Sequence, residues 1–278
     1  MSNECPATAL YCKLTDHFHR HLNKPDACRI KGGILAALKE KHEKHTCPME
    51  WFKGRLADHT VRKLERDNKT QEDIRRGVVK NLAILFADIR GFTTTTADMA
   101  PERIVELLDL FVPEMLNIIV NRHSGMVDKL LGDGIMALYG HPYQTGREIV
   151  QALHSAVDMQ QAAAALGNVL KIAGYEPVTI GVGINCGPVL VCEVGNDTYR
   201  ENTVIGAPVN LAAKMEDAAL AHEITLPARA LETVEKVKPE ILKFFGTRRA
   251  AHGVEVAVLD WRQYLENNPE DMEDWAVS

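Results

Sequence analysis

The sequence contains no apolar run that approaches the roughly 20 residues a membrane-spanning helix needs. It also has no excess of basic residues: lysine and arginine number 32 against 38 aspartates and glutamates, and the formal net charge is −6. A chain with this charge lacks the overall basic footprint of nucleic-acid-binding proteins. The first residues, MSNECPATALYCK, lack the charged segment and apolar core of a signal peptide. We therefore expect a cytoplasmic protein that binds neither membranes nor nucleic acids.

The 278 residues are 46% hydrophobic and 25% charged, which is typical of a globular chain with one large domain and a small appendage. Cysteine and histidine are concentrated near the beginning, with six of the eleven histidines at or before residue 59. Cys5, Cys12, Cys28 and Cys47 lie in the same segment. Structural disulfides are not expected in the cytoplasm. We predict a small helical, Cys/His-rich regulatory module over residues 1–49.

The four N-terminal cysteines have the spacing C-x6-C-x15-C-x18-C, which lacks the C-x2-C pairs of zinc ribbons. Wide spacing in a short helical segment can still place four thiolates around one iron–sulfur cluster. The histidines could instead be metal ligands or serve a haem group. The alternative of equal weight is a helical dimerisation cap with free cysteines. Among the metal-binding interpretations we favour the iron–sulfur cluster.

The segment that follows predicts a connection between this module and the larger domain. Trp51, Leu56, Val61 and Leu64 recur at roughly helical intervals between charged residues. We expect one connecting helix over about residues 50–68, then a polar joint, so that residues 50–78 form a signalling connection. A strand is expected at 82–88.

The remaining pattern alternates strands and helices in an order typical of an α+β, ferredoxin-like split βαβ fold. Glycine at 132 and 134 flanks Asp133 between two β-type runs and indicates a hairpin. The further expected elements are a helix at 100–125, a long helix at 147–174, a second pair of strands at 177–195 and a short helix at 206–220. We predict that this domain covers residues 79–265 and that 266–278 is an acidic tail.

Two acidic residues lie beside apolar segments, where a charged side chain is costly unless it faces a cleft. Asp88 ends the apolar run 82–87, and Asp133 lies in the hairpin turn. In this topology the first strand neighbours the hairpin, so both carboxylates can approach one point and bind Mg²⁺ together with substrate phosphates. The N–H groups of Gly91, Phe92 and Thr93 could contact phosphate oxygens. The alternative, that Asp88 caps a helix and Asp133 only forms a turn, has similar weight on spacing alone.

Four segments together resemble the signature blocks of class III nucleotidyl cyclase catalytic domains, in the family's order and spacing. They are LFADIRGFT (85–93), DKLLGDGIMALYG (128–140), VGINCGPVLVCEVG (182–195) and NTVIGAPVNLAAKMED (202–217). The segment GTRRAAHGVEVAVLDW is similar to the closing strands of that family. The resemblance covers about residues 79–262.

The resemblance implies a head-to-tail homodimer with active sites shared between subunits. It also implies that the apolar stripe of the connecting helix packs against its counterpart in the second copy, as signalling helices do in related cyclases. One subunit would hold two Mg²⁺ or Mn²⁺ ions with Asp88, Ile89 and Asp133. The ribose 3′-oxygen of the substrate would attack the α-phosphorus in line, and pyrophosphate would leave. The protein would mainly position the reacting groups and stabilise charge.

Substrate choice is implied by two further positions. Lys129 lies three residues before the glycine of the Gly-Asp turn, and Thr203 lies three before Gly206. This Lys–Thr pair resembles cyanobacterial and bicarbonate-stimulated adenylate cyclases. Lysine can donate to adenine N1 and a hydroxyl can accept from the 6-amino group, so ATP is the expected substrate. Guanylate cyclase is the alternative, because threonine discriminates less sharply than aspartate.

The resemblance also implies that Asn210 orients the ribose. Four residues later, where the family usually has arginine to stabilise the transition state, this sequence has Lys214. Lysine keeps the charge but loses the planar, bidentate fork, so Arg248 or Arg249 could assist. A degenerate cyclase domain that binds nucleotide or senses redox state is therefore a further alternative. Later cysteines, at 186 and 192, are expected to be small core residues.

Overall fold

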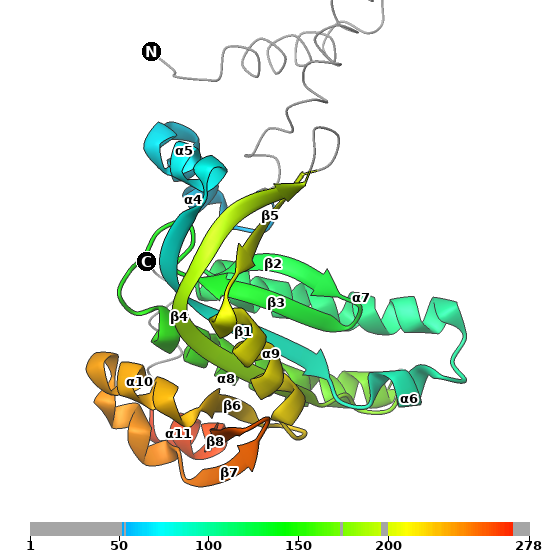
Figure 1. The fold of residues 1–278 in the computed structure, drawn as a ribbon. Helices are drawn as coiled ribbons and strands as arrows, with labels where there is room; N and C mark the ends of the chain where they lie inside the picture. The colour runs from blue at the N-terminus through cyan, green and yellow to red at the C-terminus, as the bar shows by residue number, and fades with distance from the viewer. Residues whose placement is uncertain (1–51, 53, 173–174, 196–199, 269–278) are drawn as a thin grey trace, which may run out of the picture. The chain divides into compact units, whose positions relative to one another are not determined.

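The computed structural model describes residues 52, 54–172, 175–195 and 200–268 (Figure 1). These residues form two compact units. The smaller unit contains the described residues of 1–54, 58–78 and 191–203, and the larger contains those of 55–57, 79–190 and 204–278. The larger unit carries most of the predicted site.

Two short helices of the smaller unit replace the single connecting helix expected from the sequence. They are α4 (Asp58–Arg66) and α5 (Asn68–Arg76). The chain breaks at Asp67 because its side chain caps α5, accepting a hydrogen bond from the Thr70 N–H at 3.0 Å. The expected polar joint is also wrong, since it is occupied by α5 and by the first strand, which begins at Val78.

The apolar stripe of this segment is buried within one chain. Leu56, Val61 and Leu64 have exposed fractions of 3%, 7% and 0%. They are therefore already covered and cannot form a stripe that pairs with a second copy, so that expectation is wrong for these three residues. Trp51, the fourth member, lies outside the described residues.

An eight-stranded sheet organises the fold, with the order β2-β3-β1-β4-β6-β8-β7 and with β5 paired to β4. The strands are β1 (Val78–Ile89), β2 (Met126–Leu131), β3 (Gly134–Tyr139), β4 (Ile180–Gly195), β5 (Arg200–Ile205), β6 (Ile224–Pro227), β7 (Thr247–Ala251) and β8 (Val254–Leu259). The expected hairpin and closing strands are confirmed. The pair of strands expected at 177–195 is wrong, because β4 is one continuous strand.

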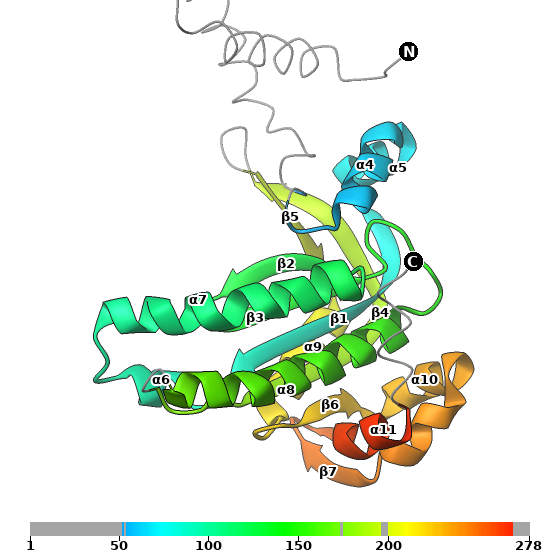
Figure 2. The same cartoon turned by 180° about the vertical axis from the view of Figure 1, so that it is seen from behind.

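The core of the larger unit has the expected ferredoxin-like, split βαβ order. Strand β3 pairs antiparallel with both β1 and β2, and β1 lies between β3 and β4. Its helices are α6 (Phe92–Thr96), α7 (Pro101–Asn117), η2 (Ile118–Arg122), α8 (Glu148–Ile172), α9 (Ala207–Ala218), α10 (Leu231–Val237) and α11 (Trp261–Asn267). Helices α7 and α8 cover one face of the sheet and α9 lies on the other (Figures 1 and 2).

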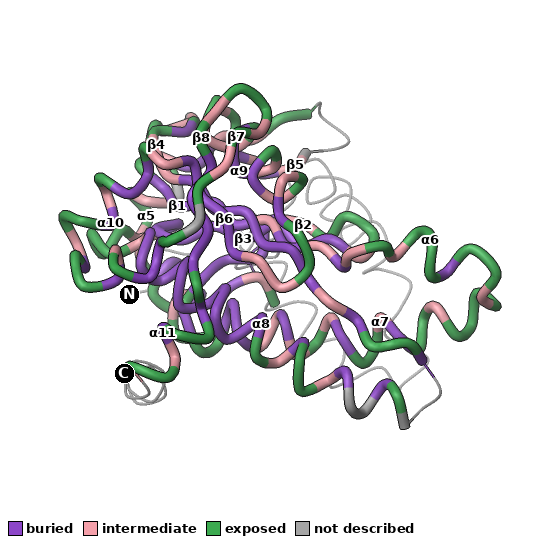
Figure 3. The backbone as a smooth tube through the Cα atoms, turned by 90° about the horizontal axis from the view of Figure 1, so that it is seen from below, coloured by how far each residue is buried: buried purple, intermediate pink, exposed green. Residues whose placement is uncertain are grey.

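Helix α8 is buried on all sides over residues 149–160, which explains why its apolar residues do not form a single stripe. Two of its buried polar side chains have internal partners: Asp158 contacts His123 at 2.9 Å and His154 contacts the Tyr264 hydroxyl at 3.0 Å. Figure 3 shows the strands β3 and β6 buried and α6 largely exposed. Among the described residues, no helix has both the length and the apolar character needed to cross a membrane.

Candidate active site

The two acids singled out in the sequence meet at one end of the β1–β3 pair. The register places Ala87 opposite Ile135, so the end of β1 lies beside the β2–β3 turn. The carboxyl groups of Asp88 and Asp133 are hydrogen-bonded to each other. Burial, this hydrogen bond and the charge of Asp88 raise the pKa of Asp133 to about 7. Two carboxyl groups so close cannot both ionise easily without a cation between them.

The chemistry of this pair fits a hard divalent cation. Asp88 Oδ1 is buried and has no hydrogen-bond partner among the described residues, although a carboxylate oxygen is a strong acceptor. The described residues contain no group of three or more His, Cys, Asp or Glu side chains arranged for a metal. A site with two carboxylates, a main-chain carbonyl such as that of Ile89 and substrate phosphates is typical of Mg²⁺.

The alternative roles for the two acids fare differently. The residue that caps α6 is Gly91, with a left-handed φ of 71°, and it has no side-chain cap. Asp88 therefore does not cap this helix, and that interpretation is wrong. Asp133 does lie in the turn between β2 and β3, as that interpretation holds, and its carboxyl group also contacts that of Asp88.

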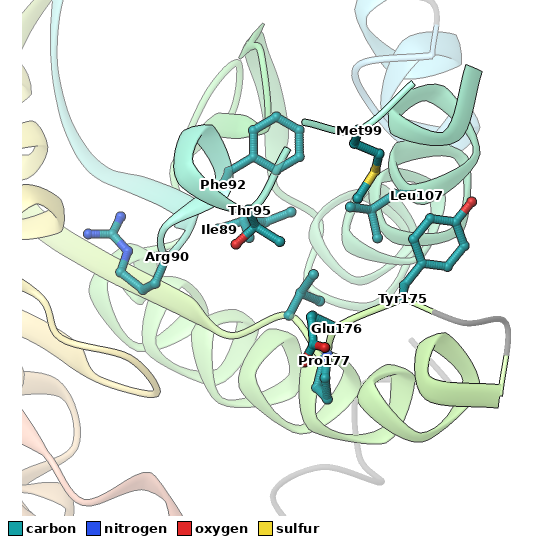
Figure 4. Close-up of a pocket in the computed structure, with 10 residues that line it drawn as sticks. Ile89, Arg90, Phe92, Thr95, Met99, Leu107, Tyr175, Glu176 and Pro177 are labelled. Carbon is teal, nitrogen blue, oxygen red and sulfur yellow. The ribbon is translucent and has the colours of Figure 1, made fainter. Parts of the chain in front are cut away.

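The loop after β1 is anchored by an apolar pocket. Phe92 lines this pocket together with Met99, Leu107 and Tyr175 (Figure 4). Thr96 closes the short helix, because its hydroxyl donates to the carbonyl of Phe92 at 2.8 Å. Gly91 and Thr93 are exposed. The Phe92 side chain thus fixes the loop from within.

Lys129 lies on β2 beside an acid that the sequence analysis passed over. Its Nζ is 3.4 Å from the Asp128 Oδ2, and the Asp128 side chain is only 1% exposed. The register of β2 shifts between Val127 and Lys129, and Arg55 donates to the main-chain carbonyl of Asp128. An acid inside an otherwise apolar strand was the available signal. Asp128 orients the Lys129 ammonium. The predicted partner of Lys129, residue 203, is half-buried on β5 in the smaller unit.

Asn210 and Lys214 lie one turn apart on α9, and both are exposed. The buried face of the helix packs through Leu211 and Met215 against Val256 of β8. The two polar side chains therefore point away from the core of their own chain and are available to a ligand or to another subunit.

The two arginines considered as substitutes for the family's arginine are both on β7. Arg249 is occupied: its guanidinium forms a bidentate pair with Glu223, with one contact at 2.9 Å, and also donates to the carbonyl of Ala218. Arg248 faces Glu255 at 3.7 Å and its side chain is 44% exposed. Of the two, only Arg248 keeps a guanidinium free enough to assist.

The cysteines separate into two groups. Cys186 and Cys192 are free thiols and half-buried, and burial raises the pKa of each, so they are poor nucleophiles at neutral pH. Cys186 packs against the main core, as expected. The predicted cluster ligands Cys5, Cys12, Cys28 and Cys47 lie outside the described residues.

The comparisons with known proteins agree with this geometry. The model of the adenylate and guanylate cyclase catalytic domain matches residues 38–249, more than half of the chain. The chain therefore belongs to this family, the class III nucleotidyl cyclases.

Particular relatives include both substrate types. An adenylate cyclase of Anabaena cylindrica is 34% identical over 141 residues, which cover 49% of this chain and 27% of that protein. The crystal structure of the adenylyl cyclase CyaB from P. aeruginosa is 28% identical with a TM-score of 0.59, covering 66% of this chain and 95% of that chain. The crystal structure of the guanylyl cyclase Cya2 is 28% identical with a TM-score of 0.60, covering 66% and 93%. The matches span only 7% to 27% of the curated relatives' own length.

Proposed function

We propose that the chain is an adenylate cyclase that converts ATP to 3′,5′-cyclic AMP and pyrophosphate at sites shared between two copies. The observation that carries this proposal is the contact between Asp88 and Asp133, which come from distant parts of the sequence and meet at the sheet end, where the pKa of Asp133 is raised. A pair of carboxyl groups held together at this cost is typical of a functional site.

The residues of the acid pair would hold two divalent cations, with the main-chain carbonyl of Ile89 as a further ligand. When bound, the cations lower the pKa of the ribose 3′-hydroxyl and neutralise the triphosphate. The chain's own contribution is to keep both carboxylates at one point and to hold the loop Gly91–Thr93 against the phosphates. Phe92 fixes that loop through the pocket behind it.

The exposed face of α9 would complete the site of the other subunit. Asn210 would orient the ribose, and the Lys214 ammonium would stabilise the negative charge that develops on the α-phosphate. The support is their exposure on one helix face, away from their own core. Leu130 and Leu131 at the end of β2 are also 48% and 53% exposed, an apolar edge that a second copy would cover.

ATP is proposed over GTP because of Lys129 and Thr203. Asp128 holds the Lys129 ammonium so that it can donate to a ring nitrogen of adenine. The Thr203 hydroxyl would accept from the 6-amino group of the base. Guanylate cyclase is the second candidate, and a degenerate, non-catalytic nucleotide-binding domain is the third, favoured by the lysine at 214.

Turnover assays with ATP and with GTP, each with Mg²⁺ or Mn²⁺, separate the three candidates. Cyclic AMP and pyrophosphate in equal amounts from ATP are expected. A preference for GTP would identify a guanylate cyclase, and nucleotide binding without product would identify a degenerate domain. The shared site is tested by mixing Asp88→Ala chains with Asn210→Ala chains, since each mixed dimer then holds one intact site. No recovery in verified heterodimers would contradict the shared site.

We further propose that residues 1–49 regulate this activity, with 50–78 as the connection, 79–265 as the catalytic domain and 266–278 as an acidic tail. An iron–sulfur cluster on Cys5, Cys12, Cys28 and Cys47 is the proposed sensor. The absorption spectrum of anaerobically purified protein tests it: broad absorption near 400 nm supports a cluster, a Soret band indicates haem, and no band indicates free cysteines.

A further inference from the structure

Arg90 follows the last residue of β1 and lies two positions after Asp88. Its side chain extends away from Phe92, Met99 and Leu107, which line the pocket behind the loop (Figure 4). Its main-chain N–H donates to the carbonyl of Thr179 at 2.8 Å. The start of this side chain is therefore fixed, and only 22% of it is exposed.

The guanidinium of Arg90 holds the C-terminal end of α9. Its Nη1 lies 3.3 Å from the Ala219 carbonyl and 3.4 Å from the Glu216 carbonyl, and the guanidinium forms an ion pair with the Glu216 carboxylate. The last carbonyls of a helix have no partner within the helix and carry partial negative charge. A guanidinium at this point both satisfies these acceptors and fixes the helix end.

Two glycines of β4 make room for this arrangement. A Cβ at Gly181 would lie 2.8 Å from the Arg90 Nε, and one at Gly183 would lie 2.0 Å from the main-chain nitrogen of Glu216. Real Cβ atoms do not approach other atoms so closely, so no larger residue fits at Gly183 unless α9 moves. The sequence of β4 is thus matched to a helix and an arginine lying directly on it.

The same guanidinium also reaches the acid pair, because Nη2 lies 3.8 Å from the Asp88 Oδ2. We propose that Arg90 is a positioning residue that fixes α9, with Asn210 and Lys214, to the strand end that carries Asp88. The inference rests on the proposed function. In a head-to-tail dimer these two half-sites of one chain belong to different active sites, so Arg90 links the geometry of the two sites.

A heterodimer with a single intact site tests this link. One chain carries Asn210→Ala and supplies Asp88, and the other carries Asp88→Ala and supplies α9. The Arg90→Ala change is then made only in the chain that supplies α9. That chain has no acid pair, so any effect on the intact site must pass through the position of its helix. We expect kcat to fall about tenfold or more with little change in the KM for Mn²⁺–ATP, because small displacements of reacting groups are costly.

Matched variants separate this effect from a loss of stability. Glu216→Gln in the same chain keeps the shape but removes the ion pair, and a smaller fall in kcat is expected. Arg122→Ala removes a half-exposed arginine that pairs with Glu114 at 3.4 Å and Asp158 at 3.8 Å rather than with α9, and should leave kcat unchanged. Dimer content and thermal midpoint are measured on the same samples.

The outcomes distinguish this inference from the proposed function. If the parent heterodimer shows no activity, the shared site fails and the Arg90 link falls with it. If the parent is active but Arg90→Ala in the α9-supplying chain changes kcat by less than about twofold, the link alone is overturned. A loss that appears only when Arg90→Ala is placed in the chain that supplies Asp88 also overturns it, because Arg90 would then act only on its own acid pair.

Discussion

At the end of β1, Asp88 and Asp133 hydrogen-bond to each other and are partly withdrawn from water, whereas Asn210 and Lys214 stand exposed on α9. The first region is assembled completely within one chain, with an internal cost that a cation would relieve. The second region lies on a helix whose buried face packs against the core, while its two polar side chains are exposed. This difference is what we expect if the active site is shared: the acid pair is assembled within one chain, and the exposed face of α9 can contact a second copy.

The largest expected effect comes from removing either member of the acid pair. Asp88→Ala or Asp133→Ala should each reduce cyclic nucleotide formation to background, because each removes a metal ligand. Folding should be unaffected or improved, since the variants relieve the crowding of two carboxyl groups. Turnover with Mg²⁺ and Mn²⁺ and thermal denaturation measure both effects. Asp109→Ala, an exposed acid on α7, is the control, and normal turnover by either site variant would contradict the metal assignment.

A smaller loss is expected on the exposed face of α9. Lys214→Ala should lower kcat roughly 10²-fold, by analogy with the loss of one donor to a developing oxyanion. Lys214→Arg should keep or raise kcat, because arginine restores the planar fork. Lys236→Ala, an exposed lysine on α10, should have no effect. If Lys214→Ala turns over like the parent, Lys214 is not the transition-state cation and Arg248 is the next residue to test.

The raised pKa of Asp133 predicts that metal binding at the acid pair depends on pH. Near pH 6 the carboxyl group is largely protonated, because its pKa is about 7, and a cation must displace the proton. Mn²⁺ binding should therefore release about one proton at pH 6 and little at pH 8, and the apparent affinity should rise with pH between these values. Calorimetry in buffers of different ionisation enthalpy measures the release. Asp88→Asn removes the charge of Asp88 but not the burial of Asp133, which is the largest cause of the raised pKa, so the proton release at pH 6 should be reduced rather than abolished. An unchanged release in that variant would refute the coupling.

The smallest effect on activity, but a clear effect on stability, is expected away from both regions. Burial, and then the charge of Lys80, lower the pKa of His141 to about 3. The folded protein keeps this histidine neutral, whereas the unfolded chain binds a proton below about pH 6.5. The free energy of unfolding should therefore fall as the pH drops from 6.5 towards 3, by up to about 1.4 kcal/mol per pH unit from this group. Urea unfolding at pH 7 and pH 5 measures it, and a slope that is the same in His141→Gln would show that other groups are responsible.

Local sequence patterns were sufficient for much of the fold. Apolar residues at helical spacing predicted α7, because a helix that lies on a sheet must bury one side of itself, and the glycines that flank Asp133 predicted the β2–β3 hairpin. The four signature blocks identified the family before any geometry was known. The same patterns failed where the boundary depends on one side chain, as at Asp67, which ends one helix and begins another.

Tertiary structure decided which of these residues meet. The sequence predicted that Asp88 and Asp133 could approach one point, but the contact itself follows from the register of β1 against β3. The sequence could not reveal that Leu56, Val61 and Leu64 are covered within their own chain, because burial is a property of the neighbours that a fold supplies.

Arg90 gives the clearest division between the two. In the sequence it is one charged residue between the end of an apolar run and a glycine. Its role depends on Glu216 and Ala219, which lie more than 120 positions later and reach it only because Gly181 and Gly183 let α9 lie on β4. The spacing of apolar residues and the local composition determine which helices and strands form, because each depends on hydrogen bonds and contacts between residues close in the sequence. Only the packing of one element on another determines which charges come close enough to act together.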